Sequence, residues 1–187
     1  QQGADYHLIT SLEDIAWLLN LRGRDVENTP VFFSFALINA DCARLYVMDK
    51  SFEGADDWEV LPYFQIFKDI KKLPAGSILL DEGIVSYALI KSLPEDVKII
   101  NSSNPAELMK SLKNDTELAA TENAHLKDGA AMVNFIRWLK QNIERETITE
   151  ISAADRLEKF RMEQEGCYDL SFSTIAGYME NGAVIHY

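Results

Sequence analysis

The sequence has few histidines and cysteines, and fewer basic than acidic residues. Its 187 residues contain 18 lysines and arginines against 30 aspartates and glutamates, so the formal net charge is -12. A surface of this sign is repelled by nucleic acid and by anionic membranes, and we predict neither as a partner. No apolar run approaches the roughly 18 residues of a membrane span, and no signal-peptide pattern is found at Gln1.

The sequence also lacks a glycine-rich phosphate loop and a paired-cysteine motif. Four glycines of the first half are isolated from one another. They are Gly23, Gly54, Gly76 and Gly83. Cys42 and Cys167 lie far apart and form no CxxC motif. We therefore predict two buried or half-buried reduced thiols, as is typical of a cytosolic protein.

The three histidines do not form a metal site by sequence. His7, His125 and His186 are widely separated, and none has a second histidine or a carboxylate at metal-ligand spacing. No Ser-His-Asp arrangement is indicated either. The residues alone therefore point to no metal ligand and no catalytic residue.

The first half alternates apolar strands with amphipathic helices. Ser11 begins a helix, with Asp14 placed to complete a capping box. Apolar runs predict strands over residues 31–38, 43–48, 77–80 and 97–100, the first two as a hairpin. Helical spacing predicts helices over residues 60–72 and 84–93. This alternation is typical of an α/β domain with a partly parallel sheet, which we assign to residues 1–104.

Arg22 is the one residue of the first half that we single out. It follows the first helix, in the segment Leu21-Arg22-Gly23. The residues alone favour a solvated or backbone-bonded arginine at a helix end.

The second half contains too few elements to bury a core of its own. It begins with a short helix over residues 106–113. Longer helices are predicted over residues 114–144, capped near Asn114, and 150–163, capped by Thr149 or Ser152. Leu170 to Tyr187 reads as a hairpin turning at Glu180-Asn181-Gly182. We therefore expect residues 105–187 to be the first part of a larger domain. The absence of Met at position 1 and the end in mid-strand lead us to expect a piece of a longer protein.

His186 lies near the end of this predicted hairpin. Its imidazole can exchange a proton near neutral pH, so it is the candidate site residue of the second half.

Four segments resemble the three-domain Xaa-Pro aminopeptidases. The first is similar to the second non-catalytic domain of that family. The others are similar to the opening helices and first hairpin of its catalytic domain, the pita-bread fold shared with methionine aminopeptidase, prolidase and creatinase. The segments are Ser11 to Ile38, Glu122 to Leu139, Thr149 to Arg161 and Ser171 to Tyr187. The resemblance implies a creatinase N-terminal-like α/β domain with a mixed sheet over residues 1–104, then a truncated first part of a pita-bread catalytic domain over residues 105–187.

The resemblance also implies an activity. Members are dinuclear metallopeptidases, usually manganese-dependent, that remove an N-terminal residue preceding proline. It implies a proline-containing peptide as substrate, a homodimer and a cytoplasmic location. At the position of His186, the family has a histidine that contacts substrate or stabilises the reacting carbonyl oxygen. Accessory domains of this superfamily overhang the active-site mouth, so Arg22 could meet an anionic substrate group there.

The family's metal ligands are two Asp, a His and two Glu, and all follow the segment that contains His186. The resemblance therefore implies no metal ligand in this chain. In isolation we expect neither tight manganese or zinc binding nor peptidase activity.

Two other functions stay open on the sequence. One is a pita-bread protein that binds peptides or proteins without catalysis, and the other is a related hydrolase such as creatinase or prolidase. His186 favours an enzyme, and the segment Leu12 to Gly23 favours an aminopeptidase over creatinase or prolidase. Uncovered apolar faces on helices 114–144 and 150–163 also predict self-association or disorder of the second half.

Overall fold

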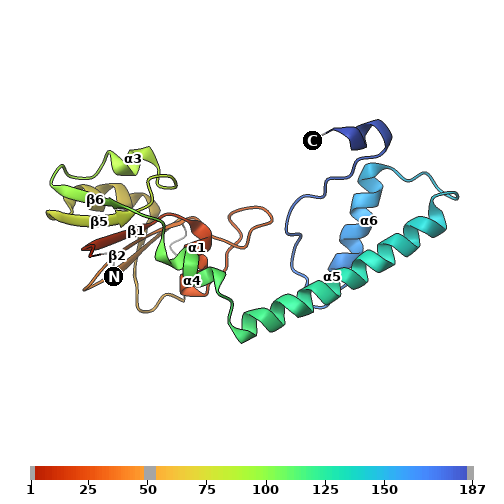
Figure 1. The fold of residues 1–187 in the computed structure, drawn as a ribbon, viewed down its shortest axis with the longest axis horizontal. Helices are drawn as coiled ribbons and strands as arrows, with labels where there is room; N and C mark the ends of the chain where they lie inside the picture. Colours follow the sequence, from red (N-terminus) through yellow and green to blue (C-terminus); the bar gives the residue numbers. More distant parts are fainter. Residues whose placement is uncertain (1–2, 49–53, 185–187) are drawn as a thin grey trace. The chain divides into compact units, whose positions relative to one another are not determined.

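The computed structural model describes residues 3–48 and 54–184 (Figure 1). The chain forms two compact units, Gln1–Leu112 and Lys113–Tyr187. No helix within the described ranges is long and apolar enough to cross a membrane.

The first unit is built on a six-stranded mixed sheet in the order β4-β3-β2-β1-β5-β6. The strands are β1 (Tyr6–Ile9), β2 (Ser34–Asn39), β3 (Ala43–Val47), β4 (Glu59–Pro62), β5 (Gly76–Leu80) and β6 (Val97–Asn101). The β1–β2 and β2–β3 pairs are antiparallel, whereas β3–β4, β1–β5 and β5–β6 are parallel. This sheet confirms the predicted α/β class with a mixed sheet.

Apolar side chains are buried on both faces of the sheet. Successive residues of a strand point to opposite faces, and accordingly Leu8 and Ile9 of β1 belong to two different core clusters. The cluster of Ile9 also contains Ile15 of helix α1 (Leu12–Leu19), and the cluster of Leu8 contains Ile66 of helix α2 (Ile66–Asp69). Helices therefore supply buried residues to each of the two clusters.

The β2–β3 hairpin forms as predicted, although β2 begins at Ser34 and not at Val31. Asn39 closes the turn, because its Oδ1 accepts hydrogen bonds from the backbone N–H groups of Asp41 (2.9 Å) and Cys42 (2.7 Å). Such an Asx turn is a common reason for asparagine at the end of a strand.

Two predicted helices of the first unit were too long. Residues 59–62 form β4 alongside β3. Only after Pro62 does the chain turn through η1 (Tyr63–Gln65), α2 and η2 (Ile70–Lys72). Of the residues on which the helical spacing rested, Ile70 is fully buried, whereas Phe64 is 67% exposed. The helix predicted over residues 84–93 is reduced to α3 (Tyr87–Ile90), and β1 was not predicted.

The helices of the second half confirm their predicted caps. α5 (Asp115–Asn142) begins after Asn114, and α6 (Glu150–Met162) begins after Thr149, each with a reciprocal capping box. The shorter α4 (Pro105–Ser111) lies within the first compact unit. The assignment of two domains to residues 1–104 and 105–187 stays a prediction.

The hairpin predicted over Leu170 to Tyr187 is wrong for its described part. Residues 170–184 contain no strand, and the predicted turn lies within the 3₁₀ helix η3 (Met179–Ala183). A two-stranded hairpin is marginally stable by itself and needs a neighbouring strand or an apolar surface beneath it. Here Phe172 and Ile175 are 68% and 70% exposed, so the tail buries too little to hold two strands together.

Candidate functional site

The first candidate residue, Arg22, lies where α1 ends. Asn20 adopts a left-handed conformation (φ 52°) and ends the helix. The Arg22 side chain then folds back on it, and its Nη1 donates to the carbonyl oxygens of Ala16 (3.2 Å) and Leu21 (2.8 Å). The structure therefore confirms that Arg22 is bonded to backbone at a helix end. It is nevertheless an exposed residue, so its charge is accessible to solvent.

The loop that carries Arg22 is tied to itself by backbone bonds. Gly23 N donates to the Pro30 carbonyl (3.3 Å), and Asp25 N donates to the Val31 carbonyl (3.1 Å). The carboxylate of Asp25 in turn accepts from Phe33 N (2.8 Å). These bonds join residues across the loop between α1 and β2. They fix the backbone of the loop that carries the Arg22 guanidinium.

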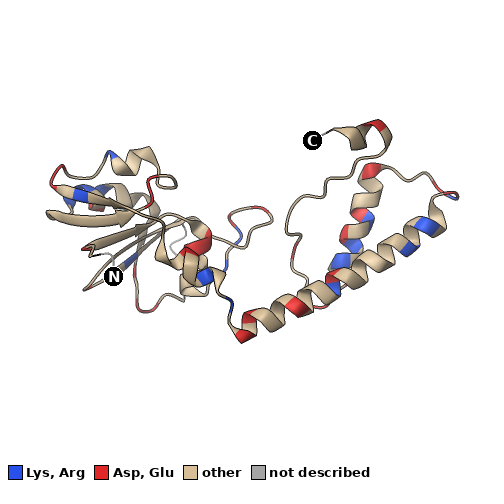
Figure 2. Cartoon of the chain, viewed as in Figure 1, with Lys and Arg blue, Asp and Glu red and all other residues tan. Residues whose placement is uncertain are grey.

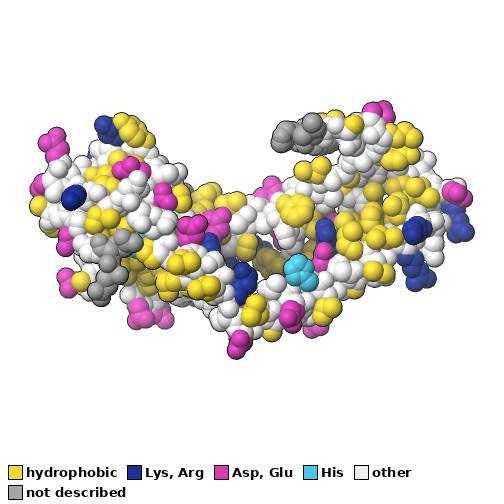
Figure 3. All heavy atoms as spheres, viewed as in Figure 1, with side chains coloured by type: hydrophobic (Ala, Val, Ile, Leu, Met, Phe, Trp, Pro, Cys, Tyr) yellow, Lys and Arg dark blue, Asp and Glu magenta, His cyan; other side chains and the backbone are white. Residues whose placement is uncertain are grey.

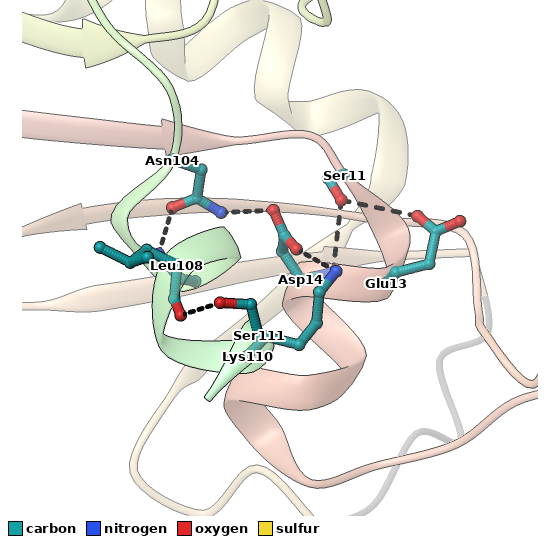
Figure 4. Close-up of polar contacts among 8 residues, drawn as sticks. Ser11, Glu13, Asp14, Asn104, Leu108, Lys110 and Ser111 are labelled. Atoms are coloured by element: carbon teal, nitrogen blue, oxygen red, sulfur yellow. Dashed lines mark hydrogen bonds and ion pairs between the residues drawn. The ribbon is translucent and has the colours of Figure 1, made fainter. Parts of the chain in front are cut away.

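A buried carboxylate connects the start of α1 to α4. Asp14 is 3% exposed. Its Oδ1 lies 2.6 Å from Lys110 Nζ, and its Oδ2 accepts from Asn104 Nδ2 at 2.7 Å (Figure 4). Asn104 also caps α4 by accepting from Ala106 N. We call Asp14, Asn104 and Lys110 the polar clip.

The polar clip corrects one prediction about α1. Ser11 caps the helix by accepting from Asp14 N (3.3 Å), as expected. The carboxylate of Asp14 does not complete the capping box, because it is bonded to Asn104 and Lys110 instead. Sequence reasoning missed this cluster. The pair Asn104-Pro105 signals a helix start, but no local pattern identifies the partner ninety residues away.

The two described histidines belong to different compact units, and neither lies in a group of described side chains that could hold a metal ion. His7 lies in β1, where burial lowers its pKa below the usual 6.5. His125 lies on an exposed position of α5. Among residues 3–48 and 54–184, no three His, Cys, Asp or Glu side chains are grouped so that they could hold a metal ion. Cys42 and Cys167 are free, half-buried thiols.

The second candidate, His186, lies outside the described residues. The segment that leads to it is attached to the start of α6. Glu150 Oε1 accepts from Tyr178 N (2.7 Å) and, with Oε2, from Asn181 Nδ2 at 3.1 and 3.2 Å. The asparagine of the predicted turn thus serves to anchor the tail to a helix.

The second unit also contains a groove of about 620 Å³ between α5 and residues 164–172. Two contacts join residues that line it: Arg161 Nε pairs with Asp128 Oδ1 (2.7 Å), and Lys127 Nζ donates to the Glu165 carbonyl (2.7 Å). Of these two contacts, only the first is an ion pair, because Lys127 donates to a backbone carbonyl oxygen.

Comparison with known families divides the chain in two. Residues 1–117 match the family model of the creatinase/prolidase N-terminal domain. Residues 119–187 match the model of metallopeptidase family M24.

Similar proteins cover the chain almost from end to end. It is 35% identical over 199 residues to a probable Xaa-Pro aminopeptidase P of Sordaria macrospora, an alignment that covers 96% of this chain and 32% of the relative. The chain thus spans about a third of the length of that relative.

Solved structures agree with this relationship. An X-prolyl aminopeptidase from Caenorhabditis elegans, described as a cytosolic enzyme with a di-nuclear active site, is similar with a TM-score of 0.82 and 25% identity. The similarity covers 92% of this chain and 30% of the nematode enzyme. An X-Pro aminopeptidase from Thermotoga maritima shares the fold, with a TM-score of 0.59, 23% identity and coverage of 86% and 47%. The chain therefore belongs to the Xaa-Pro aminopeptidase P family, with a creatinase/prolidase N-terminal domain followed by a partial M24 region.

Proposed function

We propose that this chain is part of a cytoplasmic metalloaminopeptidase that releases the N-terminal residue preceding proline in a peptide. The main support for this proposal is the alignment of 96% of the chain, at 35% identity, with a probable Xaa-Pro aminopeptidase P. The two family models follow one another along the chain, as an accessory domain and the beginning of a catalytic domain would.

The metal chemistry of this proposal needs residues beyond this chain. The described residues do not fit a dinuclear centre, because no suitable group of ligands is found among them. The family places its two Asp, one His and two Glu ligands after the segment of His186. The proposed enzyme would bind two divalent ions, Mn²⁺ by the family's usage, with ligands from that later part. This chain alone would be inactive.

His186 is proposed to contact the substrate beside the reacting carbonyl. An imidazole N–H that faces the developing negative charge on that oxygen lowers the barrier to its formation. The described residues that precede His186 are attached to α6, since Glu150 accepts hydrogen bonds from Tyr178 and Asn181.

Arg22 is proposed to face the mouth of the active site. Its loop is braced by backbone bonds, and only Nη1 is engaged in hydrogen bonds with other described residues. The remaining guanidinium N–H groups can therefore donate to a carboxylate of the peptide. Dimerisation of the enzyme is part of the same proposal.

The proposal is tested first on the reading frame of the gene beyond Tyr187. Two Asp, a His and two Glu in family order are expected there. A continued frame without them would replace the proposal with a non-catalytic protein that binds peptides.

The second test is kinetic and uses the polypeptide encoded by the full frame. With Mn²⁺ present, it should release the first residue of an Xaa-Pro peptide, measured by mass spectrometry. The H186A variant should lower kcat by about 10²-fold, the effect of removing one oxyanion donor. R22A should raise KM, and unchanged kinetics for R22A would remove only the role of Arg22. Release from peptides without proline at an equal rate would contradict the substrate class.

A further inference from the structure

The last described residues, 177–184, form a turn that is hydrogen-bonded to itself. We call it the tail turn, and it contains η3. Asn181 N donates to the Tyr178 carbonyl (3.2 Å), and Val184 N donates to the Asn181 carbonyl (3.2 Å). Bonds between residues three apart close the backbone of such short helical turns. Asn181 is therefore tied to the chain on both sides of it.

Two glycines allow the ends of the tail turn to approach each other. A Cβ on Gly177 would lie 3.0 Å from Gly182 Cα and 3.1 Å from Gly182 N. These distances are shorter than a side-chain carbon atom normally adopts, so the two backbones touch without a side chain between them. The tail turn is therefore a closed piece of backbone, and a displacement of one part is passed to the rest.

Little apolar burial holds the tail turn on the second unit. Tyr178, Met179 and Val184 are 66%, 70% and 52% exposed, and hydrophobic side chains lie at the surface of this unit (Figure 3). Among the described residues, the hydrogen bonds that join the turn to the rest of the unit are those that Glu150 accepts. The position of the turn on the described unit therefore depends on a polar contact.

Glu150 can hold the turn because it is the first residue of α6. The reciprocal capping box of Thr149 and Ser152 fixes the start of that helix. The Glu150 carboxylate accepts from Tyr178 N at 2.7 Å and from Asn181 Nδ2 at 3.1 and 3.2 Å. α6 has an acidic residue in its first turn and basic residues in its last (Figure 2), an arrangement that the helix dipole favours. The helix thus presents a charged acceptor to the tail turn.

We propose that Glu150 and Asn181 are positioning residues of the proposed reaction and act through His186. This role rests on the proposed function, in which His186 donates to the reacting carbonyl oxygen. His186 follows Asn181 by five residues, which is at most about 18 Å of chain. A donor to a developing oxyanion has to lie about 2.7 to 3.1 Å from it. Loss of an anchor so close along the chain therefore weakens the contact of His186, although neither positioning residue touches the substrate.

The test is steady-state kinetics of the polypeptide encoded by the full frame, with Mn²⁺ and an Xaa-Pro peptide. E150A should lower kcat and kcat/KM together by roughly tenfold, because the contact of His186 is needed in the transition state. E150Q should keep kcat within about threefold, since its amide oxygen still accepts from Tyr178 N. E158A is the matched control at an exposed position of the same helix, and it should leave kcat unchanged.

A double-mutant cycle with H186A separates positioning from a general loss of structure. In the H186A background, E150A should lower kcat by less than about twofold, because the residue through which Glu150 acts is already absent. N181A should behave in the same way in both backgrounds, and it carries the cycle if E150A does not fold. The melting temperature and the bound Mn²⁺ of each variant are measured alongside.

Each outcome of the cycle decides between the role of the anchor and the proposed function. An equal fall of kcat in both backgrounds would overturn the positioning role, and so would an unchanged kcat for E150A and N181A. Full activity of H186A, or no activity of the unaltered polypeptide, would instead overturn the role of His186 in the proposed function, and the positioning role with it.

Discussion

Among the glycines, Gly23 has the least space for a side chain. A Cβ on this residue would lie 2.6 Å from Phe32 Cβ and 2.8 Å from the Val31 carbonyl oxygen. Both neighbours are buried parts of the loop between α1 and β2, so they have little freedom to move. The glycine is therefore required by close packing of the loop that carries Arg22.

We expect Gly23→Ala to lower the free energy of unfolding by about 1 to 3 kcal/mol, the usual cost of overpacking. Urea denaturation, monitored by circular dichroism, measures this change in the free energy of unfolding. Gly129→Ala is the matched control, since its Cβ would meet no atom within 4 Å. In a helix interior, that change should be neutral or stabilising by up to about 1 kcal/mol. Equal effects at the two sites would contradict the packing argument.

Asp14 is a second residue whose loss should be costly. Asp14→Ala leaves Asn104 Nδ2, in a residue only 9% exposed, without the acceptor it has at 2.7 Å. It also removes the partner of the Lys110 ammonium. We expect a loss of about 2 to 4 kcal/mol. Glu13→Ala, at the neighbouring exposed position, should change stability by no more than about 0.5 kcal/mol. A comparable loss for Glu13→Ala would show that the clip adds no stability.

His7 should make the first unit sensitive to mild acid. Burial lowers the pKa of His7 in the folded chain below 6.5. Above pH 6.5 the imidazole is neutral in both states. As the pH falls through 6.5 toward the folded pKa, the unfolded chain takes up the proton first, so stability decreases. Denaturation curves between pH 8 and pH 5 should show this decrease, and His7→Gln should reduce it. His125→Gln, at an exposed site, should keep the wild-type slope.

At the scale of helices and strands, the sequence predicted elements whose signals are local. α1, α5 and α6 each begin after the expected cap residue, respectively Ser11, Asn114 and Thr149. Caps act within four residues of the helix start, and apolar spacing within a few turns, so both can be read from one segment. The backbone bonding of Arg22 was predicted for the same reason.

Elements that depend on distant partners were predicted less well. Residues 59–62 become β4 because β3 pairs with them, and a helical pattern cannot reveal that neighbour. The Asn-Gly turn of the tail was read as a hairpin, but without a paired strand Asn181 bonds to Glu150 of α6. The contact between Asp14 and Lys110 in the polar clip was not predicted, because it joins residues far apart in sequence.

The attachment of the tail to α6 can be measured directly. Glu150→Ala removes the acceptor of the Tyr178 amide and of Asn181 Nδ2. The loss of about one charge-assisted hydrogen bond should raise hydrogen exchange at the Tyr178 amide by roughly tenfold. Glu158→Ala, on an exposed position of the same helix, should leave the exchange rate unchanged. If both variants exchange alike, Glu150 does not hold the tail.

At the scale of the whole molecule, the described residues lead to a prediction about metal binding. No ligand group for a metal is found in residues 3–48 and 54–184. Calorimetric titration of the 187-residue chain with Mn²⁺, and in parallel with Zn²⁺, should therefore show no stoichiometric binding with a Kd below about 1 µM. A saturable site of that affinity would mean that this chain holds the metal by itself. Under the proposed function, the polypeptide of the complete reading frame should bind Mn²⁺ and serves as the comparison.

The polar clip also determines where the polypeptide can be divided. α4 is capped by Asn104 and held to α1 through Lys110. A recombinant protein that stops at residue 104 would lack α4 and with it the Lys110 ammonium that pairs with Asp14. It would also expose the surface of α1 that α4 covers. One that stops at Lys113 would keep both. Limited proteolysis should accordingly spare the peptide bonds of residues 104–111, and the shortest soluble form of the first unit should end after α4.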